Sequence, residues 1–221
     1  MRLFLDAFVK LACGVIVFAM LLFTPAGTLD FPGAWRLIVL LFAPMTLLGI
    51  VLLIAAPDTL RRRLKSKEKR SRQNRIVRLT GLLFITSFIV AGVDYRYGWS
   101  SLPDSAIWAA SILFIISYML YAEVMRENEW LSRRVEVMEG QKVISNGLYG
   151  IVRHPMYTST VIMFLSMPMV IGSWWAFAVM TPYVWIIVQR IKDEEELLNE
   201  ELEGYKEYCI TVRWRLLPHV W

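Results

Sequence analysis

The chain has 221 residues, of which 57% are hydrophobic and 19% are charged, and its formal net charge is +5 at pH 7. Soluble domains are on average less apolar and more charged, and the mean hydropathy here is +0.48. Because the apolar residues gather in long runs, this composition argues against a soluble protein and indicates an integral membrane protein. Much of the positive charge lies in one loop beside these runs, which indicates membrane topology and contact with lipids rather than nucleic acid binding.

Six apolar runs follow one another along the chain, at residues 8–25, 36–56, 77–94, 106–124, 156–171 and 174–190. The first four each approach the ~20 residues that a helix needs to cross the hydrocarbon layer. The last two are shorter and meet at Gly172-Ser173, which is a turn signal. The sequence therefore predicts an all-α integral membrane fold with about six transmembrane helices, the last two forming a C-terminal helical hairpin over 156–190.

The loop 57–76, which follows the second run, is strongly basic: it carries nine Lys and Arg residues against two acidic residues. The positive-inside rule places such a loop in the cytosol. Counting spans from this loop also places both termini, the segment 125–155 and the tail 191–221 in the cytosol. We expect the plasma or inner membrane in a prokaryote and the endoplasmic reticulum in a eukaryote.

The tail after the last run is rich in acidic residues, but apolar residues recur in it at helical spacing. They are Leu197, Leu198, Leu202, Tyr205 and Tyr208. This pattern predicts an amphipathic cytosolic helix, which Gly204 would weaken. The segment 213–218 contains Arg and Trp residues that suit the membrane interface.

Several familiar catalytic motifs are missing from the sequence. There is no Gly-rich nucleotide-binding fingerprint, no P-loop and no nucleophile elbow. The two histidines, His154 and His219, do not form a zinc motif. We therefore expect no metal site, and the chemistry should need neither a metal nor a covalent intermediate.

Two polar clusters flank the predicted hairpin, and the topology brings both to the same membrane face. The full set comprises Gly147, Tyr149, Arg153, His154, Tyr157, Arg190, Glu194, Glu195 and the arginines of the tail. Pro155 suits the first turn of a helix, so Arg153 and His154 lie at a helix N-terminus, which favours anionic groups. Glu194 and Glu195, where the last span ends, can bind an ammonium group or offset a sulfonium charge. Asn128, Trp130 and Ser132 precede these clusters and are weaker candidates for ligand contacts.

A ligand with a carboxylate, an ammonium group, a cationic sulfur and an adenosine suits this polar set. S-adenosylmethionine carries all four, and methyl transfer from its sulfonium depends mainly on positioning. The chain thus divides into 1–124, a four-helix membrane region with the cytoplasmic basic loop 57–76, and 125–221, a cofactor-binding catalytic region. The second region includes the membrane hairpin 156–190 and the cytosolic tail.

The run 147–157 (GLYGIVRHPMY), followed by 190–198 (RIKDEEELL), resembles the isoprenylcysteine carboxyl methyltransferase family and its prokaryotic membrane relatives. That family shows G-x-Y and R-H-P-x-Y, then a helical hairpin, then R-x-x-x-E-E-x-x-L, a Tyr-rich helix and an arginine before a late proline. Tyr205, Tyr208, Arg215 and Pro218 resemble the ending. The resemblance covers roughly residues 125–221 and leaves out the first two spans and the basic loop.

The resemblance implies an integral membrane methyltransferase that binds S-adenosylmethionine in a cytosol-facing pocket, roofed by the tail. The expected cofactor-binding residues are Gly147, Tyr149, His154, Pro155, Tyr157, Glu194 and Glu195. Arg153 and Arg215 are expected nearest the reacting end of the substrate, and with Glu195 they are the candidate catalytic residues. The resemblance also implies that a lipophilic or prenylated substrate enters laterally from the bilayer.

The methyl acceptor and two other functions stay open at this point. A carboxylate acceptor is already ionised and needs only cationic orientation by Arg153 or Arg215, whereas an amine acceptor, as in a lipid N-methyltransferase, needs a base such as Glu195 or His154. The number of arginines near the site favours an anionic acceptor. The other hypotheses are an NADPH-dependent sterol-type reductase and a non-enzymatic transporter or assembly factor. The oligomeric state cannot be inferred from the sequence.

Overall fold

The computed structural model describes residues 2–55, 57, 60–61, 71–131 and 137–221, which contain helices and no β-strand. Most of the predicted basic loop and Ser132 lie outside the described residues. The helices are α1 (Arg2–Ala26), α2 (Pro32–Ala55), α4 (Ser71–Tyr97), α5 (Asp104–Glu127), the 3-10 helix η1 (Gly147–Gly150), α6 (Pro155–Ile171), α7 (Trp174–Met180), α8 (Tyr183–Glu201) and α9 (Tyr205–Thr211). The predicted all-α fold class is confirmed.

Within the described residues, four helices are long and apolar enough to cross a membrane: Leu3–Ala26, Pro32–Ala55, Asn74–Tyr97 and Asp104–Glu127. The helix α6 is apolar but shorter. Each helix extends a few residues beyond its apolar run, because hydropathy marks the part inside the hydrocarbon whereas backbone hydrogen bonding continues into the interface. The chain is therefore an integral membrane protein.

The last two apolar runs form a hairpin, as the turn signal predicts. Gly172 adopts a left-handed φ of 101°, and the hydroxyl of Ser173 accepts a hydrogen bond from the Ala176 backbone N–H at 3.1 Å to start α7. The second arm is not one continuous helix over 174–190, because α7 ends at Met180 and α8 begins after Pro182. Proline has no N–H to continue the helix and crowds the preceding turn. The helix α8 then runs on to Glu201, well past the apolar run.

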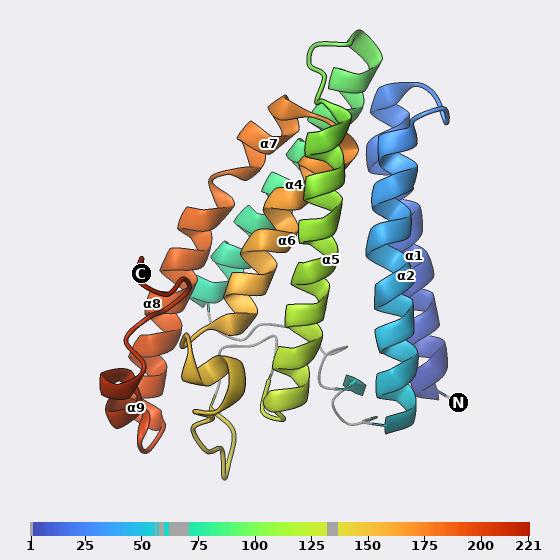
Figure 1. The fold of residues 1–221 in the computed structure, drawn as a ribbon. Helices are drawn as coiled ribbons and strands as arrows, with labels where there is room; N and C mark the ends of the chain where they lie inside the picture. The colour runs from blue at the N-terminus through green and yellow to red at the C-terminus, as the bar shows by residue number, and fades with distance from the viewer. Residues whose placement is uncertain (1, 56, 58–59, 62–70, 132–136) are drawn as a thin grey trace.

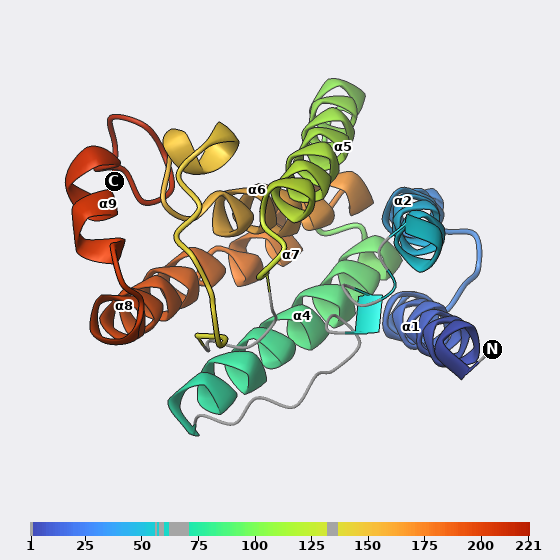
Figure 2. The same cartoon turned by 90° about the horizontal axis from the view of Figure 1, so that it is seen from below.

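The connections α1–α2, α4–α5 and α6–α7 lie at one end of the helical bundle (Figure 1). The opposite end carries the N-terminus, the C-terminal end of α5, the N-terminal end of α6 and the segment from α8 to α9. Seen from below, α9 and the end of α8 lie on the side furthest from α1 (Figure 2). The two polar clusters of the sequence thus reach the same end of the bundle.

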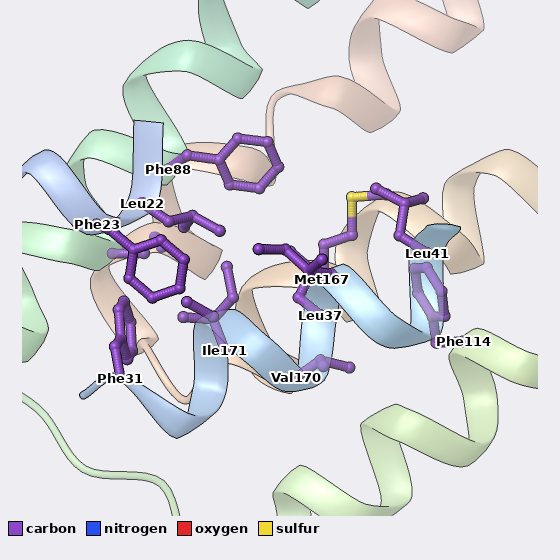
Figure 3. Packing of buried hydrophobic residues seen from close by; sticks show 14 of the residues in the cluster. Leu22, Phe23, Phe31, Leu37, Leu41, Phe88, Phe114, Met167, Val170 and Ile171 are labelled. Atoms are coloured by element: carbon purple, nitrogen blue, oxygen red, sulfur yellow. The ribbon is translucent and has the colours of Figure 1, made fainter. Parts of the chain in front are cut away.

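The main apolar core joins α1, α2, α4, α5 and α6. Leu22, Leu37 and Phe114 are fully buried, and Met167 is 2% exposed. Figure 3 shows Leu37 of α2 beside Met167 of α6. The aliphatic and aromatic side chains of this core hold the hairpin against the first two helices and so fix the position of both of its ends.

A buried carboxylate fixes the hairpin turn at the end of the bundle away from the polar clusters. Asp94 is 1% exposed. It accepts hydrogen bonds from the Ser100 backbone N–H at 2.8 Å, the Ser100 hydroxyl at 2.6 Å and the Ser173 hydroxyl. A buried carboxylate needs such donors, so this arrangement locks the α6–α7 turn onto the α4–α5 connection.

Replacing Gly33 by alanine is expected to lower stability, because α2 and α6 meet there backbone to backbone. A Cβ at Gly33 would lie 1.9 Å from the carbonyl oxygen of Ile171. The helices must separate to relieve this clash, and we expect a loss of about 1–3 kcal/mol in the free energy of unfolding. Thermal unfolding in detergent measures this loss of stability.

Gly49→Ala is the matched control for Gly33→Ala. Gly49 lies in the same helix, and a Cβ there would meet no atom within 4 Å. Alanine is favoured over glycine inside a helix by about 0.5–1 kcal/mol, so this variant should be neutral or slightly stabilised. Equal melting temperatures of the two variants would contradict the close approach of α2 and α6.

Candidate functional site

The N-terminus of α6 supplies the first half of the site. His154 is the N-cap of α6, and Pro155 occupies the first turn, where proline's missing N–H costs no helical hydrogen bond. Before it, Gly147 has a φ of 55° and opens the 3-10 helix that carries Tyr149. The other half comes from α8, whose straight continuation past the membrane segment carries Glu194 and Glu195.

Glu195 lies at the centre of a cluster formed with the side chains of Arg153, His154 and Arg215. Its Oε1 lies 3.1 Å from His154 Nε2 and 3.2 Å from Arg153 Nε, and its Oε2 accepts a hydrogen bond from Arg215 Nε at 2.8 Å. Glu195 is 7% exposed, and the Arg153 side chain is 8% exposed. The site therefore contains a buried ionic cluster that joins α6, α8 and the tail.

The environment of Glu195 keeps its carboxylate ionised. Burial by itself opposes ionisation, but the hydrogen bonds from His154 and Arg215 and the charge of Arg153 outweigh burial and lower the pKa of Glu195 below its usual value. A carboxylate with a lowered pKa is a weak base. Glu195 is thus suited to holding cations in place and poorly suited to accepting a proton.

The tail is tied to the start of α6 through the backbone as well. The N–H of Arg153 donates to the Trp214 carbonyl at 2.8 Å, and the N–H of His154 donates to the Arg215 carbonyl at 3.0 Å. The Thr158 hydroxyl also donates to the Leu216 carbonyl at 2.8 Å. These bonds place the Arg215 side chain against Glu195, and they fix the tail over the end of the hairpin.

Glu194, the neighbouring carboxylate, has a different set of contacts. The Tyr157 hydroxyl donates a hydrogen bond to Glu194 Oε2, and Arg190 Nε donates to the Tyr157 oxygen at 2.8 Å. The Arg190 guanidinium also lies over the Tyr157 ring at 5.8 Å from its centroid, a favourable cation–π geometry. Residues three to four positions apart on a helix share a face, so Arg190 and Glu194 meet Tyr157 from the same side of α8.

A cleft opens beside these clusters, between the end of α5, the segment 141–157, α8 and α9. It holds about 840 Å³ of empty space, including space that is open to solvent. Its walls are formed by Asn128, Trp130, Leu131, Gln141, Lys142, Val143, Ile144, Tyr149, Arg153, His154, Met156, Tyr157, Glu194, Leu197, Leu198, Leu202, Tyr205 and Tyr208. The wall thus combines apolar and polar side chains, and Arg153, His154 and Glu194 form its polar end.

The structure brings most of the expected site residues together at this cleft, but in different roles. Five of them line it: Tyr149, Arg153, His154, Tyr157 and Glu194. The remaining four, Gly147, Pro155, Glu195 and Arg215, are not among its lining residues. Glu195 contacts two of the lining residues, Arg153 and His154, and Arg215 donates a hydrogen bond to Glu195.

Gly147 has a packing role that its expected place in the cofactor site does not explain. A Cβ there would lie 1.7 Å from Glu127 Oε1. The two oxygens of Glu127 instead accept hydrogen bonds from the Leu148 N–H at 2.9 and 3.1 Å. Glycine is therefore needed at 147 for the turn and for this close approach, which anchors the 3-10 helix to the end of α5.

Sequence reasoning did not assign Tyr205 and Tyr208 to the cleft wall, although it predicted their helix. The Tyr208 hydroxyl donates to the Tyr149 carbonyl at 2.7 Å, and Asn128 Nδ2 donates to the Tyr149 hydroxyl at 2.8 Å. Their spacing in an amphipathic helix was the available signal. The segment 141–144 carries no recognisable motif, so its place in the wall could not be found from sequence.

Membrane-spanning helices and a cleft with a polar end, built on a helical hairpin, define a class: an integral membrane protein with a small-molecule site at one end of its helix bundle. The isoprenylcysteine carboxyl methyltransferase (ICMT) family matches residues 109–200. Over this segment the chain is similar to that family of membrane methyltransferases, in line with the sequence resemblance. The match starts earlier than expected, within α5, and ends before α9 and the tail arginines.

The chain also resembles part of a larger membrane enzyme. It is 29% identical over 89 residues to the mouse (Mus musculus) Delta(14)-sterol reductase TM7SF2, which corresponds to 37% of this chain and 20% of the reductase. The similarity therefore spans only a fifth of that relative. It does not favour the alternative of a sterol-type reductase.

Proposed function

We propose that the protein transfers a methyl group from S-adenosylmethionine to a lipophilic carboxylate at the cytosolic face of the membrane. The observation that carries this proposal is the polar end of the cleft, which a carboxylate, Glu194, and a positive side chain, Arg153, both line. Methyltransferases of the ICMT family use S-adenosylmethionine as donor. Its amino-acid end needs both signs of charge, and the apolar side chains of the wall suit adenosine and a lipid chain.

The residues of the cleft fit the methyl donor in charge and in hydrogen bonding. Glu194 suits the ammonium group, and the buried hydroxyl of Tyr205, which has no hydrogen-bond partner, requires a polar group in the cleft. When bound, the donor supplies an electrophilic methyl group: the carbon–sulfur bond breaks as a carbon–oxygen bond to the acceptor forms, and the electron pair stays on sulfur. The chain itself has to orient both partners and exclude water.

The electrostatics of the cluster favour a carboxylate acceptor over an amine. Arg153, Arg190 and Arg215 carry three positive charges against the two negative charges of Glu194 and Glu195, so an excess of positive charge is left to attract an anion. An amine would require a base, and the lowered pKa of Glu195 makes it a poor one. The excess charge supports a role for Arg153, which lines the cleft, in orienting the acceptor carboxylate.

The proposed sidedness follows from the positions of the helix ends. The C-terminal end of α2 and the N-terminal end of α4, which flank the basic loop 57–76, lie at the same end of the bundle as the cleft (Figure 1). The positive-inside rule then places the cleft, the N-terminus and the tail in the cytosol, where the methyl donor is made. A lipophilic acceptor, free or carried as a prenyl group, would reach the cleft from the bilayer.

Binding and methyl transfer test the proposal on the full chain purified in detergent. We expect calorimetry to show binding of S-adenosylhomocysteine. We also expect labelled methyl groups to pass from S-adenosylmethionine to a lipophilic carboxylate such as N-acetyl-S-farnesylcysteine. An ester releases its methyl group as methanol in base, whereas an N-methylated phosphatidylethanolamine does not. Folded protein that binds no S-adenosylhomocysteine would refute the proposal, and base-stable label would show an amine acceptor.

A further inference from the structure

Two buried side-chain atoms of the described residues have no hydrogen-bond partner, Arg153 Nε and the Tyr205 hydroxyl oxygen. Arg153 Nε is 3.2 Å from Glu195 Oε1 and so has an ionic partner even though the geometry is poor for a hydrogen bond. The Tyr205 hydroxyl has neither a hydrogen-bond partner nor an ionic partner among the described residues. Tyr205 is 4% exposed and lines the cleft. A buried hydroxyl without a partner is unfavourable, so a ligand group is expected beside it.

The surroundings of Tyr205 define which group it can bind. Burial and the charges of Glu195 and Glu194 raise the pKa of Tyr205, so the hydroxyl stays protonated and can donate a hydrogen bond. Its helix α9 is held in place independently, since Tyr208 one turn later bonds to the Tyr149 carbonyl. The missing partner is therefore an acceptor that a ligand brings into the cleft.

Glu194 lines the same cleft and presents the opposite polarity, an anionic acceptor. Tyr205 lines this cleft as well, so the two groups face the same space. A hydrogen-bond donor and an anionic acceptor in one cleft match a carboxylate and an ammonium group that share one carbon atom.

We propose that Tyr205 binds the carboxylate of the methionine moiety of the methyl donor, while Glu194, which lines the same cleft, receives its ammonium group. This inference rests on the proposed function and adds to it the orientation of the donor. The amino-acid end lies between α8 and α9, at the polar end of the cleft. The adenosine then extends along the wall formed by α5 and the segment 141–144. The tail helix thus takes part in binding the donor in addition to covering the cleft.

Tyr205→Phe is the test, with binding measured by calorimetry in detergent. The affinity for S-adenosylhomocysteine should fall about tenfold, as expected for the loss of one hydrogen bond to a charged group. The affinity for decarboxylated S-adenosylhomocysteine, which keeps the ammonium and adenosine, should be the same in wild type and variant. Because the hydroxyl has no partner in the protein, the melting temperature without ligand should not fall.

Tyr208→Phe is the matched control, since it removes a tyrosine hydroxyl of the same short helix that is bonded within the protein. It should lower the melting temperature without ligand, whereas Tyr205→Phe should not. Unchanged binding of S-adenosylhomocysteine by Tyr205→Phe would overturn the inference and indicate that water alone satisfies the hydroxyl. Equal losses of affinity for S-adenosylhomocysteine and for its decarboxylated form would also overturn the inference. Neither result touches the proposed function, which fails only if wild type binds no S-adenosylhomocysteine.

Discussion

Glu195→Gln is expected to lower the free energy of unfolding by about 3 kcal/mol, because breaking a buried ion pair by removing one partner leaves the other charge uncompensated. Arg153 is the buried partner, with 8% of its side chain exposed, whereas 34% of the Arg215 side chain reaches solvent. Most of the loss should therefore come from Arg153. In a chain of this length the melting temperature would fall by roughly 6–12 °C.

The same substitution should loosen the tail before the whole protein unfolds. Arg215 is held by Glu195 and by the backbone pairing of the tail with residues 153–154. Without the carboxylate, trypsin should cleave sooner at Lys206 and Arg213, which are exposed residues of this segment. Glu200→Gln on the exposed side of α8 is the control and should change stability by less than about 0.5 kcal/mol. Equal trypsin resistance in wild type and Glu195→Gln would contradict the role assigned to the cluster.

Acid should remove the contribution of Glu195 from the wild type. A carboxylate whose pKa is lowered by folding stabilises the folded state fully above its unfolded value, near 4.5. That contribution is lost as the pH falls through the lower pKa of the folded state. The difference in melting temperature between wild type and Glu195→Gln should therefore be constant above pH 4.5 and shrink below it. A difference that does not change between pH 7 and the acid limit of folding would show that ionisation of Glu195 is not its cause.

The meeting of residues 153–157 with Glu194 and Glu195 could be predicted because it depends only on two apolar arms and a turn. Gly172 and Ser173 mark the turn, and arms of similar length return the chain to the face from which it entered. The break at Pro182 does not change this, since α8 resumes one residue later and keeps its direction. Apolar pattern and turn chemistry are both local properties of a sequence.

The family resemblance implied that the tail covers the cofactor pocket, but the bonds that dock the tail could not be predicted, because they leave no trace in the side-chain pattern. The bonds from the N–H groups of Arg153 and His154 to the carbonyls of Trp214 and Arg215 use backbone groups that nearly every residue has. For the same reason the wall segment 141–144 was not found. These parts of the site depend on the tertiary fold alone.

The different roles of Glu194 and Glu195 could not be predicted from the sequence either. Consecutive residues of an α-helix point about 100° apart, so two adjacent carboxylates cannot face one ligand from the same side. Only the rotation of α8 about its axis decides which one faces the cleft. The structure places Glu194 at the cleft and Glu195 in the ionic cluster, so a pair expected to act together separates into a group that lines the cleft and a group that holds Arg153 and Arg215.

Glu194→Gln tests this separation, and it should reduce the affinity for S-adenosylhomocysteine by about 10–100-fold, as expected for the loss of a charged hydrogen-bond acceptor. The amide oxygen of glutamine can still accept the hydrogen bond of the Tyr157 hydroxyl. Its stability without ligand should therefore change far less than that of Glu195→Gln. Calorimetry and thermal unfolding on the same preparation measure both effects.

The donor analogues then identify the group that Glu194 holds. Glu194→Gln should bind decarboxylated S-adenosylhomocysteine more weakly than wild type does, because that ligand keeps the ammonium group. Glu194→Gln should bind S-adenosyl-4-thiobutyrate, an analogue with a carboxylate but no ammonium group, as tightly as wild type does. Tyr205→Phe should show the reverse pattern: weaker binding of S-adenosyl-4-thiobutyrate and unchanged binding of decarboxylated S-adenosylhomocysteine. The reason is that this variant lacks only the hydrogen-bond donor to the carboxylate. If Glu194→Gln weakened all three ligands equally, its carboxylate would shape the cleft without contacting the ammonium group, and the orientation of the donor inferred from Tyr205 would lose its second point of attachment.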